Sequence, residues 1–160
     1  MSDTLASSPT AHEEPTPDLA TLSGLDQLRL AMSGQGAIAP IAQTVGFDLV
    51  EVEAGRVVFE ATPTRAVYNP LGTVHGGWMA TVLDSACGCV VHSMLKPGQT
   101  YTTLELKTVF HKALKAGTPV RAVGRIIQAG RRAAFSEAEM RGIDGTLYAT
   151  ATSTCLVMER

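Results

Sequence analysis

The chain has 160 residues, of which 45% are hydrophobic and 18% are charged, and its formal net charge is −2 at pH 7. This length suits one domain, and the near-neutral charge gives no electrostatic reason to expect a nucleic-acid or membrane partner. No window has the roughly 18 uninterrupted apolar residues of a membrane span, and the N-terminus lacks a secretory signal pattern. Three cysteines are too few for a disulfide framework and lack metal-ligand spacing, so we expect reduced thiols, no metal and a cytoplasmic location.

The N-terminal segment differs in composition from the rest of the chain. Residues 1–20 are rich in Ser, Thr, Pro and acidic residues, which is typical of a disordered tail, so one folded domain is expected over residues 21–160. Leucines at near-helical spacing predict a short amphipathic helix over residues 22–32, with Ser23 as its N-cap. Residues 38–41 are expected to form a loop that packs apolar side chains on the domain.

Period-two patterns and turn residues predict six strands around one long helix. The helix is expected over residues 76–95, with an apolar stripe on one side and small residues on another. The strands are expected over residues 47–53, 56–62, 102–110, 120–128, 133–141 and 146–157. Strict alternation puts Thr103 on the exposed side of its strand together with Glu105. The order β-β-α-β-β-β-β predicts an α+β fold in which a twisted antiparallel sheet packs against the helix.

The start of the predicted long helix reads Asn69-Pro-Leu-Gly-Thr-Val-His75-Gly76-Gly77. Consecutive glycines at a helix start leave backbone N–H groups free, and the missing β-carbons let a ligand oxygen approach them. This arrangement can form an oxyanion hole for a carbonyl under attack. Alternatively, the two glycines only let the helix enter the sheet closely.

Asp84 interrupts the otherwise apolar helix. A carboxylate there is costly to desolvate, and desolvation raises its pKa and suits it to be a general base or nucleophile. The alternative is a solvated or hydrogen-bonded structural carboxylate. Asp84 lies eight residues after Gly76, or about 12 Å along the axis, so one chain cannot place both groups against one carbonyl. Two antiparallel helices in a two-fold dimer can do so, which predicts an obligate dimer with two shared sites.

The pattern Asn69-x5-His75-Gly76-Gly77-x6-Asp84, followed by four predicted strands, resembles the hot-dog-fold acyl-CoA thioesterases. It is most similar to the phenylacetyl-CoA thioesterase (PaaI) type, which is related to the 4-hydroxybenzoyl-CoA thioesterases, and the likeness covers about residues 36–158. The resemblance implies a long central helix wrapped by the sheet and hydrolysis of an acyl- or aryl-CoA to free acid and CoA. It also implies a homodimer, a tetramer of two dimers, and no metal or redox cofactor.

The resemblance further implies roles for individual residues. The Gly76 N–H would polarise the thioester carbonyl, and His75 would orient the loop or contact that carbonyl. Asn69 would hold the attacking water or the carbonyl, and the partner subunit's Asp84 would act as general base or nucleophile. Thr103 matches a Ser or Thr that positions water in relatives. Without the resemblance, Asn69, His75 and Thr103 can each be structural.

Other residues are expected to contact the substrate. Gly77 and Thr81 lie on the small-residue face of the helix, and Trp78 at the helix start is either a pocket contact or a core residue. Arg131 and Arg132 follow a predicted turn, and their guanidinium groups suit the CoA phosphates, although paired surface arginines are often only solvated. A non-catalytic acyl-CoA-binding or regulatory hot-dog protein is the alternative function. The pattern does not specify the acyl group.

Overall fold

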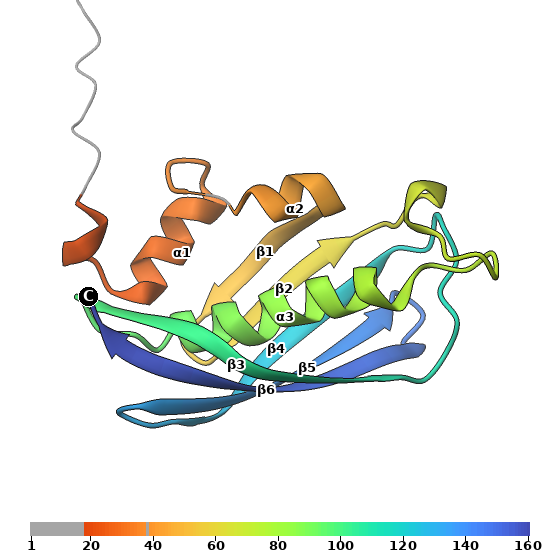
Figure 1. Cartoon of the computed structure of the whole chain (residues 1–160). Coiled ribbons are helices and arrows are strands. Elements are labelled where there is room, and N and C mark those ends of the chain that lie inside the picture. Colours follow the sequence, from red (N-terminus) through yellow and green to blue (C-terminus); the bar gives the residue numbers. More distant parts are fainter. Residues whose placement is uncertain (1–17, 38) are drawn as a thin grey trace, which may run out of the picture.

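The computed structural model describes residues 18–37 and 39–160. One long helix, α3 (Gly76–His92), lies against a curved antiparallel sheet with the strand order β1-β2-β4-β5-β6-β3 (Figure 1). The strands are β1 (Phe47–Glu53), β2 (Arg56–Ala61), β3 (Gln99–Phe110), β4 (Val120–Ala129), β5 (Ala133–Gly142) and β6 (Leu147–Glu159). The predicted α+β class, six strands and element order are confirmed.

Residues 1–17 of the tail expected over residues 1–20 lie outside the described residues. The next residues form a single 3-10 turn, η1 (Leu19–Thr21), in which the Ala20 N–H donates to the Asp18 side chain. The domain boundary expected at residue 21 stays a prediction.

Two short helices precede the sheet, α1 (Gly24–Met32) and α2 (Pro40–Val45). Ser23 caps α1 as predicted, because its side chain accepts a hydrogen bond from the Asp26 N–H. The expected loop over residues 38–41 is wrong, since Pro40 begins α2. Proline at the first helical position loses no hydrogen bond, and Gly46 ends the helix in the left-handed region at φ 79°.

The core lies between α3 and the inner face of the sheet. Val82, Leu83, Ala86 and Val90 of α3 are fully buried there. Gly124 of β4 lies beneath the helix, where a β-carbon would come within 2.4 Å of the Ala86 carbonyl oxygen. Glycine at this position therefore lets helix and sheet approach closely.

The C-terminal end of α3 is fixed by Ser93, so the helix ends at His92 rather than at the predicted residue 95. The Ser93 hydroxyl donates to the Val90 carbonyl at 2.7 Å and accepts from the Gly55 N–H at 3.0 Å. The second bond joins the helix end to the turn between β1 and β2, which positions α3 on the sheet.

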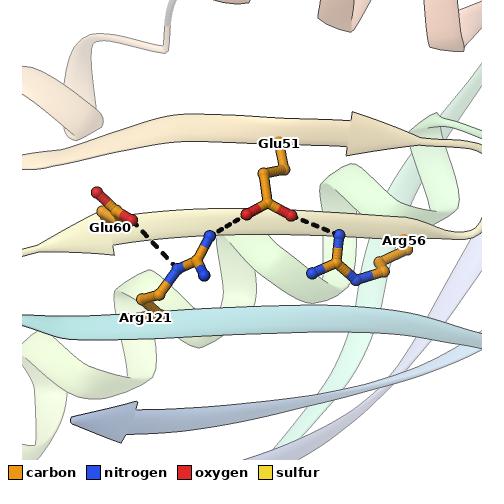
Figure 2. A network of polar contacts seen from close by, with 4 residues as sticks. All are labelled: Glu51, Arg56, Glu60 and Arg121. Carbon is orange, nitrogen blue, oxygen red and sulfur yellow. Dashed lines mark hydrogen bonds and ion pairs between the residues drawn. The ribbon is translucent and has the colours of Figure 1, made fainter. Parts of the chain in front are cut away.

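The outer face of the sheet, away from α3, has a charged network (Figure 2). Glu51 of β1 accepts from Arg56 at 2.6 Å and also pairs with Arg121 of β4. The Arg121 Nε is 3.1 Å from Glu60, without hydrogen-bond geometry. The two arginines, Arg56 most, hold the pKa of Glu51 below its usual value. Val58, opposite Glu51 in register, is 0% exposed, which indicates that the aliphatic stems of the network cover it.

A β-bulge at Leu104 sets the orientation of β3 relative to α3. The pairing of β3 with β6 shifts between Thr103 and Glu105, and Thr103 lies opposite the buried Cys155. Thr103 and Leu106 therefore share the face directed at α3, while Glu105 is on the outer face. Thr103 is exposed in the single chain, as expected, but the expectation that it shares a face with Glu105 is wrong, because the extra residue of a bulge reverses the alternation.

Candidate active site

Asn69 organises the loop that leads into α3. Its side-chain oxygen accepts from the N–H groups of Leu71 at 3.0 Å and Thr73 at 3.2 Å, and its amide nitrogen donates to the Thr73 hydroxyl at 2.9 Å. An asparagine amide carries two N–H donors, so one donor is left for a ligand after the bond to Thr73. The side chain thus has a structural role that is compatible with the predicted contact to water or carbonyl.

His75 caps α3 and distinguishes the two glycines that follow it. Its Nδ1 accepts from the Gly77 N–H at 2.8 Å, so the neutral ring carries its proton on Nε2. The Gly77 N–H is therefore occupied. In the described part of the chain the Gly76 N–H has no hydrogen-bond partner, which leaves it available to a ligand oxygen at the positive end of the helix dipole.

A cavity of about 320 Å³ opens at this end of α3. Its lining includes Asn69, Gly76, Met79, Phe110 and Lys112. It combines the free backbone donor of Gly76, an amide, an aromatic ring and a cation, which suits an acyl group attached to an anionic ligand. Neither Asp84 nor Thr103 lines it.

Phe110 is a lining residue that the sequence analysis missed. A β-carbon at Gly76 would lie 3.0 Å from the Phe110 Cζ, so glycine lets the ring pack over the helix start without being displaced. The small-residue face of α3 was the available signal, because small residues allow another element to approach. That element is β3.

Asp84 lies on the side of α3 that faces β3. Thr103 donates to the Asp84 carboxylate over 3.4 Å, and no lysine or arginine of residues 18–37 or 39–160 forms an ion pair with Asp84. Burial raises the pKa of Asp84, and the Thr103 hydrogen bond offsets part of that rise. Asp84 is therefore a better proton acceptor than an ordinary exposed aspartate.

The predicted site residues form two separate groups in one chain. The helix-start half-site contains Asn69, His75 and Gly76, and the acid half-site contains Asp84 and Thr103. The eight residues between Gly76 and Asp84 span about 12 Å of helix. A single carbonyl cannot contact both half-sites of the same chain.

The other predicted substrate contacts have intramolecular roles. The Thr81 hydroxyl donates to the Gly77 carbonyl at 2.8 Å and is partly exposed. Trp78 is 5% exposed, and its indole N–H donates to the Val45 carbonyl at 2.9 Å. Trp78 thus lies in the core and fastens α2 to α3, which is the core alternative considered for it.

Arg131 and Arg132 are exposed in the turn between β4 and β5, and this turn lies toward the same end of the molecule as the C-terminal end of α3 (Figure 1). Residues near that helix end, Val91 and Leu95, cluster with Ala134 of β5. The 17 residues of α3 span about 25 Å, so within one chain the arginines lie far from Gly76. Their contact with CoA phosphates stays a prediction.

Other parts of the molecule do not contain a competing catalytic constellation among the described residues. A cavity of about 420 Å³ lies on the outer sheet face and another of about 330 Å³ lies beneath α1 and α2, but no predicted site residue lines either.

Burial raises the pKa of Cys87 and Cys89 to about 12, so both are unreactive thiols. Residues 18–37 and 39–160 contain no metal-binding cluster of His, Cys, Asp or Glu. None of their helices is long and apolar enough to cross a membrane.

Comparisons with known proteins agree with this arrangement. The thioesterase superfamily model matches residues 71–149. The 1,4-dihydroxy-2-naphthoyl-CoA hydrolase of Listeria monocytogenes is 28% identical over 91 residues, which are 57% of this chain and 73% of that protein.

Two solved structures are similar over most of the chain. A phenylacetic acid degradation-related protein from Ralstonia eutropha is 30% identical, with a TM-score of 0.75 over 81% of this chain and 98% of that one. A Streptococcus mutans protein with bound acetyl CoA is 27% identical, with a TM-score of 0.67 over 72% of this chain and 90% of that one. The chain therefore belongs to the thioesterase superfamily, and it is a thioester hydrolase with the hot-dog fold.

Proposed function

We propose that this protein is an acyl-CoA thioesterase that hydrolyses the thioester of an acyl- or aryl-CoA to a free acid and CoA. The observation that carries the proposal is the partly buried Asp84, which has a raised pKa and a hydroxyl partner in Thr103. The acetyl CoA in the Streptococcus mutans structure and the naphthoyl-CoA hydrolase from Listeria support CoA thioesters as substrates.

The two half-sites supply complementary parts of the reaction. The Gly76 N–H donates to the thioester oxygen and stabilises the negative charge that develops there. His75 orients that loop, and the free amide proton of Asn69 contacts the carbonyl or the water. The acyl group lies along the small-residue face of α3 and contacts Gly77 and Thr81.

Asp84 of the partner subunit activates the water. As the water oxygen bonds to the carbonyl carbon, the carboxylate accepts a proton; the carbon–sulfur bond then breaks, and the proton passes to the CoA sulfur. The second route begins with direct attack by Asp84 on the carbonyl carbon; the carbon–sulfur bond breaks, CoA leaves as its thiolate, and water then hydrolyses the acyl-aspartyl anhydride, with its proton passing to the thiolate. Either route consumes one water and needs no metal or redox cofactor.

A two-fold dimer would bring the half-sites together. β3 is the last strand of the sheet, so one of its edges is unpaired in the chain. It exposes large apolar side chains at Leu104 (63%), Val109 (43%) and Phe110 (51%). An unpaired, apolar edge is a surface that a second copy can cover. A tetramer of two such dimers is the larger assembly that we expect.

The antiparallel arrangement also gives the arginines a role. If the two copies of α3 run in opposite directions, the C-terminal helix end of one subunit lies beside the helix start of the other. The partner subunit's Arg131 and Arg132 would then be on the same side of the assembly as Gly76. There they can bind the phosphates of CoA by charge-assisted hydrogen bonds.

A thiol-release assay over a panel of aryl-, short-chain and long-chain acyl-CoAs tests the activity. We expect turnover of at least one thioester by the wild type and its loss in Asp84→Asn. If acyl-CoA binds, by calorimetry, but no panel member is hydrolysed, the protein is the non-catalytic binder and the proposal is overturned.

A mixing experiment tests whether the sites are shared. Asp84→Asn and Gly76→Pro should each be inactive, the second because proline removes the N–H donor. A heterodimer has one site with both native half-sites, so mixed chains should recover part of the wild-type activity. No recovery, despite heterodimers detected by mass spectrometry, would contradict shared sites.

A further inference from the structure

Two pairs of residues on β3 and α3 are separated by nearly the same distance along their elements, so both pairs can be in contact. Gly88 follows Asp84 by four residues on α3, or about 6 Å. Tyr101 precedes Thr103 by two residues on β3, or about 6.6 Å. Thr103 contacts Asp84, and Tyr101 contacts Gly88. The acid half-site therefore continues one helical turn along α3.

The Tyr101 hydroxyl occupies the space that a side chain at position 88 would fill. A β-carbon on Gly88 would lie 2.8 Å from the Tyr101 hydroxyl oxygen and 3.2 Å from its Cε2. The ring of His92 packs edge-on against the Tyr101 ring, with 5.7 Å between centroids, and holds its orientation. Gly88 is thus the residue that lets this phenol reach α3.

The hydroxyl is a donor with no partner in the described part of the chain. None of the hydrogen bonds among residues 18–37 and 39–160 involves it, although the Tyr68 hydroxyl accepts from the Ala116 N–H. Burial strongly raises the pKa of Tyr101, and the charge of Asp84 adds to the rise. The phenol therefore keeps its proton at neutral pH, so its O–H is available to donate a hydrogen bond.

We propose that the Tyr101 hydroxyl is a positioning group that holds the hydrolytic water beside Asp84, together with Thr103. The proposal rests on the proposed thioesterase function. A carboxylate that accepts a proton from water needs the water oriented toward the carbonyl, and a second hydroxyl one turn away supplies a fixed contact for it. The phenol suits this role because it is held by packing and has no competing intramolecular bond.

Tyr101→Phe tests the role because it removes only the oxygen and keeps the ring contact with His92. We expect kcat to fall about 10- to 100-fold, with KM for the acyl-CoA within about threefold. The melting temperature should be nearly unchanged, because the hydroxyl makes no bond in the described residues. Tyr148→Phe is the matched control, since Tyr148 is buried on β6 seven residues from Cys155, roughly 23 Å along the strand; its kcat should match the wild type.

Variants at Gly88 separate water positioning from packing. Gly88→Ala should displace the phenol and lower kcat, but should have little further effect in a Tyr101→Phe background. Gly88→Ser in that background returns a hydroxyl to the vacated space. The kcat of this double variant should be at least tenfold higher than that of Tyr101→Phe alone. A packing defect would not be rescued in this way.

The outcomes separate this proposal from the function on which it rests. If Asp84→Asn is inactive while Tyr101→Phe keeps the wild-type kcat, the role of Tyr101 alone is overturned. A loss of kcat in Tyr101→Phe that Gly88→Ser does not restore also overturns it. If the wild type releases no thiol from any panel thioester, the thioesterase function fails, and the role of Tyr101 fails with it.

Discussion

Replacing Asp84 with asparagine should stabilise the protein while it removes activity. The carboxylate has a single 3.4 Å hydrogen bond and no ion pair in the described residues, and burial is the main influence on its pKa. A neutral amide of the same shape avoids the desolvation cost of the charge. Because Asp84 is only partly buried, solvent screens its charge, and the gain at pH 7 is at most on the order of 1 kcal/mol, which corresponds to a rise of about 3 °C in melting temperature.

The pH dependence of this gain has a defined sign. The folded-state pKa of Asp84 is raised above the unfolded-state value, which is about 3.9. The contribution of Asp84 to stability is therefore fully present below the unfolded-state pKa and is lost as pH rises through the folded-state pKa. The difference between Asp84→Asn and the wild type should be small near pH 3.5 and largest at neutral pH.

The activity of the same variant should change in the opposite direction. Loss of a general base costs about 10²–10⁴ in rate, or about 2.7–5.5 kcal/mol of activation free energy. Differential scanning fluorimetry from pH 3.5 to 8 and thiol release at pH 7 measure the two effects. Asp48→Asn, which changes an exposed carboxylate on β1, is the matched control and should alter neither. A lower melting temperature for Asp84→Asn at pH 7, or a kcat above one-tenth of wild type, would refute the reasoning.

Two further substitutions test other residues. Trp78→Phe should lower the free energy of unfolding by about 1–3 kcal/mol, because it removes the bond to α2 and leaves a carbonyl unpaired, with kcat within about twofold of wild type. A specific change in acyl preference without loss of stability would instead make Trp78 a pocket wall. Arg131→Gln combined with Arg132→Gln should raise KM for acyl-CoA about tenfold and leave kcat unchanged. Acyl-pantetheine thioesters, which lack the nucleotide phosphates, should show no such change, and an equal rise in KM for them would exclude phosphate binding.

The features that the sequence predicted correctly depend on local patterns. Alternating apolar residues and Gly-containing turns mark all six strands, and the stripe of apolar residues marks α3, because both periodicities follow from backbone geometry. The short helix α2 was missed, since its six residues make too few turns to show a helical period. The helix α3 ends at His92, before the predicted residue 95, because Ser93 is hydrogen-bonded to Gly55, which is distant in sequence.

The candidate site was predicted less completely than the fold. The composition of the helix start indicated the free N–H group at Gly76, because consecutive glycines at a helix start leave backbone N–H groups accessible to a ligand. The contact between Asp84 and Thr103 depends on the bulge in β3, for which the sequence carries no clear signal. Phe110 and Tyr101 were missed for a related reason: the small residues of α3 indicate an approaching element without identifying it.

The bulge at Leu104 has a consequence for comparing this enzyme with its relatives. Because one extra residue reverses the side-chain alternation, the register of β3 decides which hydroxyl faces the acid. A relative without the bulge would present to its helix a side chain that an ungapped alignment pairs with Leu104 rather than with Thr103. Deleting Leu104 would remove the bulge and still leave Thr103 and Leu106 on the face directed at α3, because Thr103, Glu105 and Leu106 would then alternate regularly. Assigning water-positioning residues across this superfamily therefore requires strand register as well as residue identity.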